Sequence, residues 1–137
     1  MSKQRINPPE LAPTLQYGFS QIVTTRGGKT VYLAGQVGWD ENGEIVGKGD
    51  FQAQLQRTFE NIATAMRATG GGMQDVVSMR IYTVNESAEE RTQIRQALRG
   101  FFPEKHAPAT TWLGVRALSN PDFLIEIEAI GVIEEAA

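Results

Sequence analysis

The C-terminal stretch FLIEIEAIGVI, residues 123–133, decides the fold expected for this chain. It is apolar except for Glu126 and Glu128. Side chains of a strand alternate between its two sides, so both glutamates share one side and the other side is wholly apolar. Burying an unpaired carboxylate costs several kcal/mol or makes it take up a proton. The stretch therefore predicts a largely covered strand whose glutamates reach a cleft.

The segments upstream predict further strands and a hairpin. Residues 19–25 and 29–39 read as strands separated by a Gly27-Gly28 turn, and Asn42-Gly43 within residues 40–46 is a hairpin signal. Residues 75–84 and 109–118 have the β-branched and aromatic content typical of strands. Together with residues 123–133, these segments predict a mainly antiparallel sheet.

Two amphipathic helices are expected between the strands. The first follows Asp50, an N-cap residue, and apolar side chains recur at helical spacing until the glycines at 70–72. The second begins after Ser87, which forms a capping box with Glu90, and ends before Pro103. The fold class is therefore α+β. Two helices cover one face of such a sheet, so we expect another copy of the chain to cover the other.

Composition narrows the classes of function. The chain of 137 residues is expected to be one domain, 1–137. It has no cysteine and one histidine, so we expect neither a metal site nor a cofactor. The net charge is −3 and the 13 Lys and Arg residues are scattered, which disfavours nucleic acid as a partner. No signal peptide or membrane anchor is recognisable, so a cytoplasmic protein without a membrane partner is expected.

Several motifs together resemble the Rid family, the reactive-intermediate deaminases also called YjgF-like proteins. They are GFSQIV at 18–23, VYLAGQVG at 31–38, GGGMQDVVSMRIYTV at 70–84, FFPE at 101–104, PATTWLGVRAL at 108–118 and LIEIEAIGV at 124–132. The resemblance implies a chorismate-mutase-like fold with a six-stranded sheet and two helices on one face. It also implies a homotrimer that binds small molecules in clefts between subunits. The characterised branch hydrolyses imines and enamines to keto acids and ammonia.

The resemblance also assigns roles to residues. In the deaminase branch, an arginine after the PA dipeptide binds the substrate carboxylate, and the first glutamate of IEIE activates the attacking water. That glutamate is Glu126 here, whereas Thr110 stands in place of the arginine. Further departures replace a tyrosine, a serine and an asparagine of the family with Phe19, Ala34 and Arg95.

These departures lead to a hypothesis about the substrate. Without a neighbouring guanidinium, the pKa of Glu126 should be higher than in a relative that has the arginine. The cleft is expected to be bordered by Phe19, Ala34, Thr110 and Trp112, with Thr111 as a further substrate-binding candidate, and it should be more apolar than in those relatives. This favours a neutral or cationic imine, enamine or heterocycle resting on the Trp112 ring. Alternatively, Arg116 or Arg95 binds an anionic group from a new position.

Simpler interpretations remain open for each residue. Glu126 and Glu128 could be structural acids, Trp112 could be a core aromatic, and Thr110 and Thr111 could be ordinary strand residues. For the chain as a whole, the alternative to a deaminase is a non-catalytic protein that binds or senses a metabolite. A ribonuclease or translation inhibitor is disfavoured by the acidic net charge.

Overall fold

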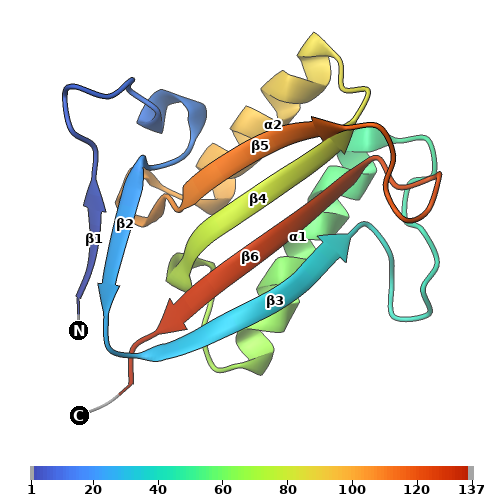
Figure 1. Cartoon of the computed structure of the whole chain (residues 1–137). Coiled ribbons are helices and arrows are strands. Elements are labelled where there is room, and N and C mark those ends of the chain that lie inside the picture. Colours follow the sequence, from blue (N-terminus) through green and yellow to red (C-terminus); the bar gives the residue numbers. More distant parts are fainter. Residues whose placement is uncertain (1, 136–137) are drawn as a thin grey trace.

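The computed structural model describes residues 2–135 as six strands, two α-helices and three short 3₁₀ helices (Figure 1). The strands are β1 (Ser2–Ile6), β2 (Ile22–Arg26), β3 (Lys29–Val37), β4 (Val76–Val84), β5 (Ala109–Val115) and β6 (Ile125–Ile133). The α-helices are α1 (Phe51–Ala68) and α2 (Ala88–Phe101), and the 3₁₀ helices are η1 (Leu15–Tyr17), η2 (Met73–Asp75) and η3 (Glu104–His106). The predicted α+β class is confirmed.

The strands form a four-stranded sheet of order β3-β6-β4-β5 and a separate β1-β2 hairpin. Strand β6 is antiparallel to both of its neighbours, and its position between them agrees with the prediction of a largely covered strand. Strands β4 and β5 are parallel, because α2 carries the chain back across the sheet between them. A single parallel bridge, from Ser20 to Ala109, connects the hairpin region to the free edge of β5.

Six strands are present, as expected, but they do not form the one six-stranded sheet that the resemblance implies, because β1 and β2 pair only with each other. Two further details differ. The predicted hairpin at 40–46 is a tight turn with one isolated bridge, between Trp39 and Ile45. The Asp40 carboxylate accepts hydrogen bonds from the backbone of Asn42 and Glu44, which folds the segment on itself before strands can extend from it. The sixth strand is instead β1, a polar N-terminal segment without alternation that pairs with β2.

Both helices pack on the same face of the four-stranded sheet, as Figure 1 shows with the helices behind it. Asp50 and the Ser87–Glu90 capping box bind the first backbone N–H groups of the helices, as predicted. The core consists of the apolar sides of both helices and the inward sides of the strands: Leu55, Phe59, Ile62, Met66, Met79, Ile81, Ile94, Leu98, Ile125, Ile127 and Ala129. The apolar side of the opening stretch thus faces the helices.

The other side of the sheet, here called the open face, is not covered by any described residue. It carries the side chains that alternate with the core: Tyr32, Ser78, Arg80, Tyr82, Thr111, Leu113, Glu126, Glu128 and Ile130. Tyr32 is 77% exposed and Leu113 is 40% exposed. Both glutamates of β6 therefore point away from the core. Within residues 2–135, no helix has the length and hydropathy needed to cross a membrane.

Candidate functional site

Glu126 lies near one end of the open face, at the start of β6, where it pairs with Val37 at the end of β3 and with Tyr82 near the end of β4. Its side chain is partly buried. Burial is the main cause that raises the pKa of Glu126 above its usual value, and the nearby Glu128 carboxylate adds to the rise. A carboxyl group with a raised pKa is suited to proton transfer near neutral pH.

Gly35 makes the position of Glu126 possible. Strand β3 has an irregularity between Leu33 and Gln36, where the exposed Ala34 and Gly35 lie opposite β6. A methyl group built on Gly35 would overlap the Glu126 carboxylate. The backbone of Gly35 has no positive φ, so glycine is required here for close approach rather than for conformation. Sequence reasoning identified Ala34 but missed Gly35.

Glu128, two residues along β6, is held by neighbours on β4. The Tyr82 hydroxyl donates a hydrogen bond to Glu128 Oε1, and Arg80 Nη1 lies 4.0 Å from the same oxygen. The pKa of Tyr82 is raised, first because its proton bonds the carboxylate. Tyr82 was also missed, since its position opposite Glu126 depends on the β4-β6 register. A groove of about 310 Å³, lined in part by Tyr32, Arg80 and Glu128, continues along this face.

Tyr82→Phe should remove a component of the alkaline titration. The hydrogen bond to Glu128 stabilises the folded state below about pH 10, and this contribution is lost as the pH rises through the raised pKa of folded Tyr82. Tyrosinate absorbance recorded against pH should therefore lack its late-ionising component in the variant. The free energy of unfolding at neutral pH should fall by about 1 kcal/mol, because the bond is partly exposed. If the component lost in the variant ionises together with the other tyrosines rather than after them, the hydroxyl does not bond Glu128.

Glu126 is expected to lower stability where it is ionised. Its pKa in the folded state lies above the unfolded value of about 4.3, so ionisation favours the unfolded chain. Glu126→Gln should therefore be more stable than the wild type at pH 7, and the difference should disappear below about pH 4. Urea unfolding from pH 4 to pH 8 measures this, with the exposed Glu60→Gln as control. A variant less stable than the wild type at pH 7 would reveal a stabilising partner of the carboxylate.

Three of the other predicted residues meet in a separate cleft beside β5, here called the aromatic cleft. Phe19, Arg95 and Trp112 line it, together with Tyr17, Glu86, Arg91 and Gly114, around a volume of about 400 Å³. The Trp112 indole donates a hydrogen bond to Glu86 at 3.0 Å. The Arg95 guanidinium carbon lies 5.3 Å from the centre of the Tyr17 ring, a cation–π contact.

Charge in the aromatic cleft is not balanced. Arg91 lies 4.0 Å from the Glu86 carboxylate, which also accepts the indole hydrogen bond. Arg95 is partly buried and forms no ion pair with any residue of the described part of the chain. Arg95 is thus the cation available to a ligand in this cleft.

The remaining predicted residues are divided between the two sides of the sheet. Thr110 pairs with Met79 and Trp112 pairs with Ile81, so both share the side of the helices. Thr111 pairs with Arg80 and is exposed on the open face. The Thr110 hydroxyl donates to the Pro108 carbonyl at 3.1 Å.

Arg116 follows the end of β5, is exposed, and does not line the aromatic cleft. Trp112 of the aromatic cleft shares the side of the helices, whereas Glu126 lies on the open face. Within a single chain, Glu126 and the aromatic cleft are therefore on opposite sides of the sheet. Among residues 2–135, no group of three His, Cys, Asp or Glu side chains could hold a metal ion.

The chain is similar to a known protein family, to named relatives and to solved structures. Residues 10–133 match the family model Ribonuc_L-PSP, described as endoribonuclease L-PSP. A 2-iminobutanoate/2-iminopropanoate deaminase from Dermatophagoides farinae is 34% identical over 98% of this chain and 100% of its own length. The 3-aminoacrylate deaminase RutC of Acinetobacter baylyi is 32% identical over 90% of this chain and 89% of its own. A crystal structure from Yersinia pestis, described as a Rid family protein of unknown function, has a TM-score of 0.90 and 38% identity, covering 97% of this chain and 100% of that one.

Proposed function

This chain belongs to the Ribonuc_L-PSP family, and we propose that it hydrolyses the C=N bond of an imine or enamine. Two proteins named as deaminases are similar to it, one over 98% and the other over 90% of its length. The observation that carries the proposal is the Glu126 carboxyl group. It has a raised pKa, it is partly buried on the open face, and Gly35 leaves room for it. Two similar proteins are named as deaminases of imino or enamine acids, which supports the same reaction class.

Glu126 can move both protons that the reaction requires. An enamine first tautomerises to the imine. As water oxygen bonds to the imine carbon, the Glu126 carboxylate accepts a proton from the water, and this proton passes to the nitrogen. The product is a carbinolamine. Glu126 then accepts the hydroxyl proton while the C–N bond breaks, the C=O bond forms and the proton leaves with nitrogen as ammonia. The raised pKa of Glu126 makes its carboxylate a stronger base toward water.

The complete site is proposed to form between copies in a homotrimer. Glu126 and the aromatic cleft lie on opposite sides of the sheet, so one protomer alone does not bring them together. The exposed Tyr32 and Leu113 on the open face favour its burial against another copy. A neighbouring protomer could then place its aromatic cleft, or a residue from it, against Glu126.

The substrate is proposed to carry a carboxylate that binds Arg95. Arg95 is the cation without an ion pair in the aromatic cleft, whereas Arg116 lies outside it. Phe19, Tyr17 and Trp112 offer aromatic surface for an apolar substrate side chain. Of the two substrate hypotheses drawn from the sequence, this proposal follows the one in which an arginine at a new position binds an anionic group. A neutral or cationic substrate resting on Trp112 is the opposing outcome.

Arg95→Met tests this assignment. If Arg95 binds the substrate carboxylate, the variant should raise KM for a 2-imino acid about 10- to 100-fold with a smaller change in kcat, because a charge-assisted hydrogen bond is lost. Arg99→Met is the matched control, since Arg99 is exposed one turn further along α2 and bonds the Gln16 carbonyl. Steady-state kinetics with a 2-imino acid and with an uncharged imine distinguish the hypotheses. Equal effects on both substrates would contradict carboxylate binding by Arg95.

The reaction itself is tested with imines generated in place. An amino acid oxidase produces 2-imino acids from several amino acids, and semicarbazide traps the imine that remains. The protein should lower the trapped amount, and Glu126→Gln should not. Thermal stabilisation by a ligand without any acceleration would instead favour the non-catalytic binding protein. Cleavage of RNA that persists through further purification and is lost in Glu126→Gln would favour a ribonuclease.

A further inference from the structure

Glu126 lies where the hydrogen bonding of the sheet comes to an end. Beyond the irregularity of β3, two residue pairs join this strand to β6, Gln36 with Ile127 and Val37 with Glu126. Strand β3 ends at Val37, and β6 begins at Ile125, one residue before Glu126. The ends of secondary-structure elements open more readily than their centres. The backbone around Glu126 therefore needs contacts from outside the sheet if its carboxyl group is to keep one position.

The side-chain amide of Asn61 on α1 holds the end of β3. Its Nδ2 atom donates hydrogen bonds to the backbone carbonyl of Val37, at 2.8 Å, and to that of Trp39, at 2.9 Å. Val37 is the residue that pairs with Glu126. Arg57, one turn earlier on α1, donates from Nε to Asn61 Oδ1 at 3.1 Å, which fixes the orientation of the amide. The N–H groups of Asn61 are thus directed at the strand end beside Glu126.

The side-chain amide of Gln54, also on α1, holds the start of β6. Gln54 is completely buried. Its Oε1 atom accepts a hydrogen bond from the backbone N–H of Leu124 at 2.9 Å, and Nε2 donates to the carbonyls of Asp122, at 3.0 Å, and Gly47, at 3.2 Å. Leu124 lies two residues before Glu126. Without the amide, these buried backbone groups would lose their partners, so the chain that leads into β6 would loosen.

Gly38 allows the end of β3 to lie close to α1. A methyl group built on Gly38 would come within 2.8 Å of the Cα atom of Gln54 and 3.0 Å of its backbone oxygen. The backbone of Gly38 has no positive φ, so glycine is required for close approach. Helix α1 packs on the helical side of the sheet, whereas Glu126 projects from the open face. The two amides therefore act on Glu126 through the backbone of β3 and β6.

We propose that Asn61 and Gln54 are positioning residues for Glu126. Together they fix the end of β3 and the start of β6, and so hold the carboxyl group where it meets the attacking water. The inference rests on the proposed role of Glu126 in imine hydrolysis. Because an error of about 1 Å in the position of a catalytic group is enough to slow a reaction about 10²-fold, the two amides matter for turnover although they lie on the helical side.

Asn61→Leu removes both bonds to β3 and keeps the size of the side chain. It should lower kcat for a 2-imino acid about 10- to 100-fold and change KM less than about threefold, because the aromatic cleft is untouched. The ¹³C resonance of the Glu126 carboxyl group, followed against pH, should show that its pKa falls toward the usual value, because a loosened strand end admits water. Gln54→Met should change both quantities in the same directions through β6.

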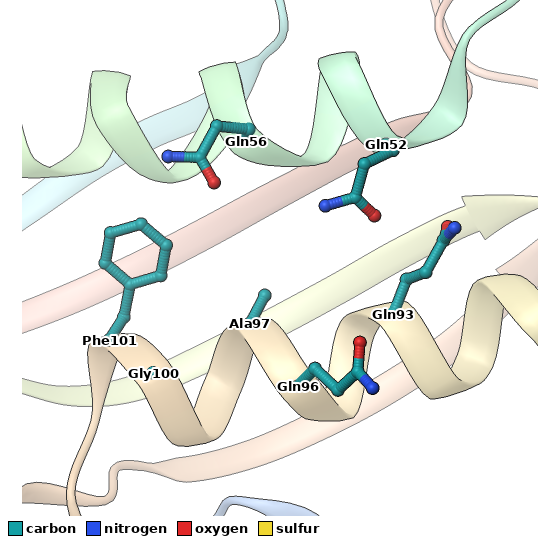
Figure 2. Close-up of a pocket in the computed structure, with 7 residues that line it drawn as sticks. All are labelled: Gln52, Gln56, Gln93, Gln96, Ala97, Gly100 and Phe101. Atoms are coloured by element: carbon teal, nitrogen blue, oxygen red, sulfur yellow. The ribbon is translucent and has the colours of Figure 1, made fainter.

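Two control variants separate positioning from a loss of stability. Gln56→Met changes the same type of side chain on the same helix, but Gln56 is exposed and points with Gln52 toward α2 (Figure 2). Ile94→Val removes one buried methyl group from the core on α2 and should lower the melting temperature. Neither variant should change kcat or the pKa of Glu126.

The proposal is overturned if Asn61→Leu and Gln54→Met keep the kcat and the Glu126 pKa of the wild type, or if Ile94→Val changes both quantities as much as they do. Asn61→Leu decides by itself if Gln54→Met fails to fold, because Asn61 is only partly buried. A wild type that hydrolyses no imine would refute the proposed function. The pKa of Glu126 in the two variants would still show whether the amides hold its carboxyl group in place.

Discussion

Glu126→Gln should lower kcat/KM for imine hydrolysis by about 10²- to 10⁴-fold, the contribution typical of a general acid or base. A glutamine amide has nearly the same shape as the carboxyl group but cannot accept a proton from water at neutral pH. Substrate binding should change less than turnover, because the aromatic cleft is untouched. Single-turnover and steady-state kinetics on generated imines measure the two quantities separately.

Two comparisons make the Glu126 result specific. Glu60→Gln removes an exposed carboxylate on α1, far from the open face, and should leave kcat/KM unchanged. The inactive Glu126→Gln should also be more stable than the wild type at pH 7, since the raised pKa opposes ionisation in the folded state. An active Glu126→Gln protein would exclude this carboxyl group as the acid-base catalyst.

Gly35→Ala should have nearly as large an effect on turnover without changing any ionisable group. Its methyl group would overlap the Glu126 carboxylate, so the glutamate must rotate away or β3 must move. Displacing a catalytic group by about 1 Å is enough to lower the rate about 10²-fold. Overpacking should also cost about 1–3 kcal/mol in the free energy of unfolding.

Gly114→Ala is the matched control for stability. Gly114 also lies in a strand, has no positive φ, and has nothing within 4 Å of an added methyl group. This variant should unfold within about 0.5 kcal/mol of the wild type. The Gly35→Ala/Glu126→Ala double variant should be less destabilised than the sum of the single changes, because truncating Glu126 removes the overlap. Additive free energies would show that the two residues are not in contact.

Local patterns were sufficient for most of the fold. The spacing of apolar residues and the caps at Asp50 and Ser87 predicted both helices, and the apolar residues 123–133 predicted β6 as a largely covered strand. These signals are contained in a few consecutive residues. The prediction failed where local signals were weak or misleading, at the polar strand β1 and at the turn of residues 40–46.

The candidate site could be predicted only in part. The resemblance to Rid proteins selected Glu126, Phe19, Arg95 and Trp112, and the structure groups the last three in the aromatic cleft. The resemblance gave no reason to prefer Arg95 over Arg116 as the arginine that binds a substrate anion. Whether either side chain lies in the cleft depends on where β5 and α2 begin and end. Gly35 and Tyr82 were missed for a related reason, since each matters through a residue on another strand.

The sequence by itself determined the α+β class, the two helices and a glutamate on the uncovered side of the last strand. Only the tertiary structure decided that Gly35 lies beneath that glutamate, that Tyr82 holds Glu128, and that Trp112 faces the opposite side of the sheet. The physical reason is the range of the interactions. Periodicity and capping act within one or two turns of chain. Strand register along β6 instead joins residues that are between 42 (Thr83 and Ile125) and 104 (Lys29 and Ile133) positions apart, and it is set by the packing of the whole sheet.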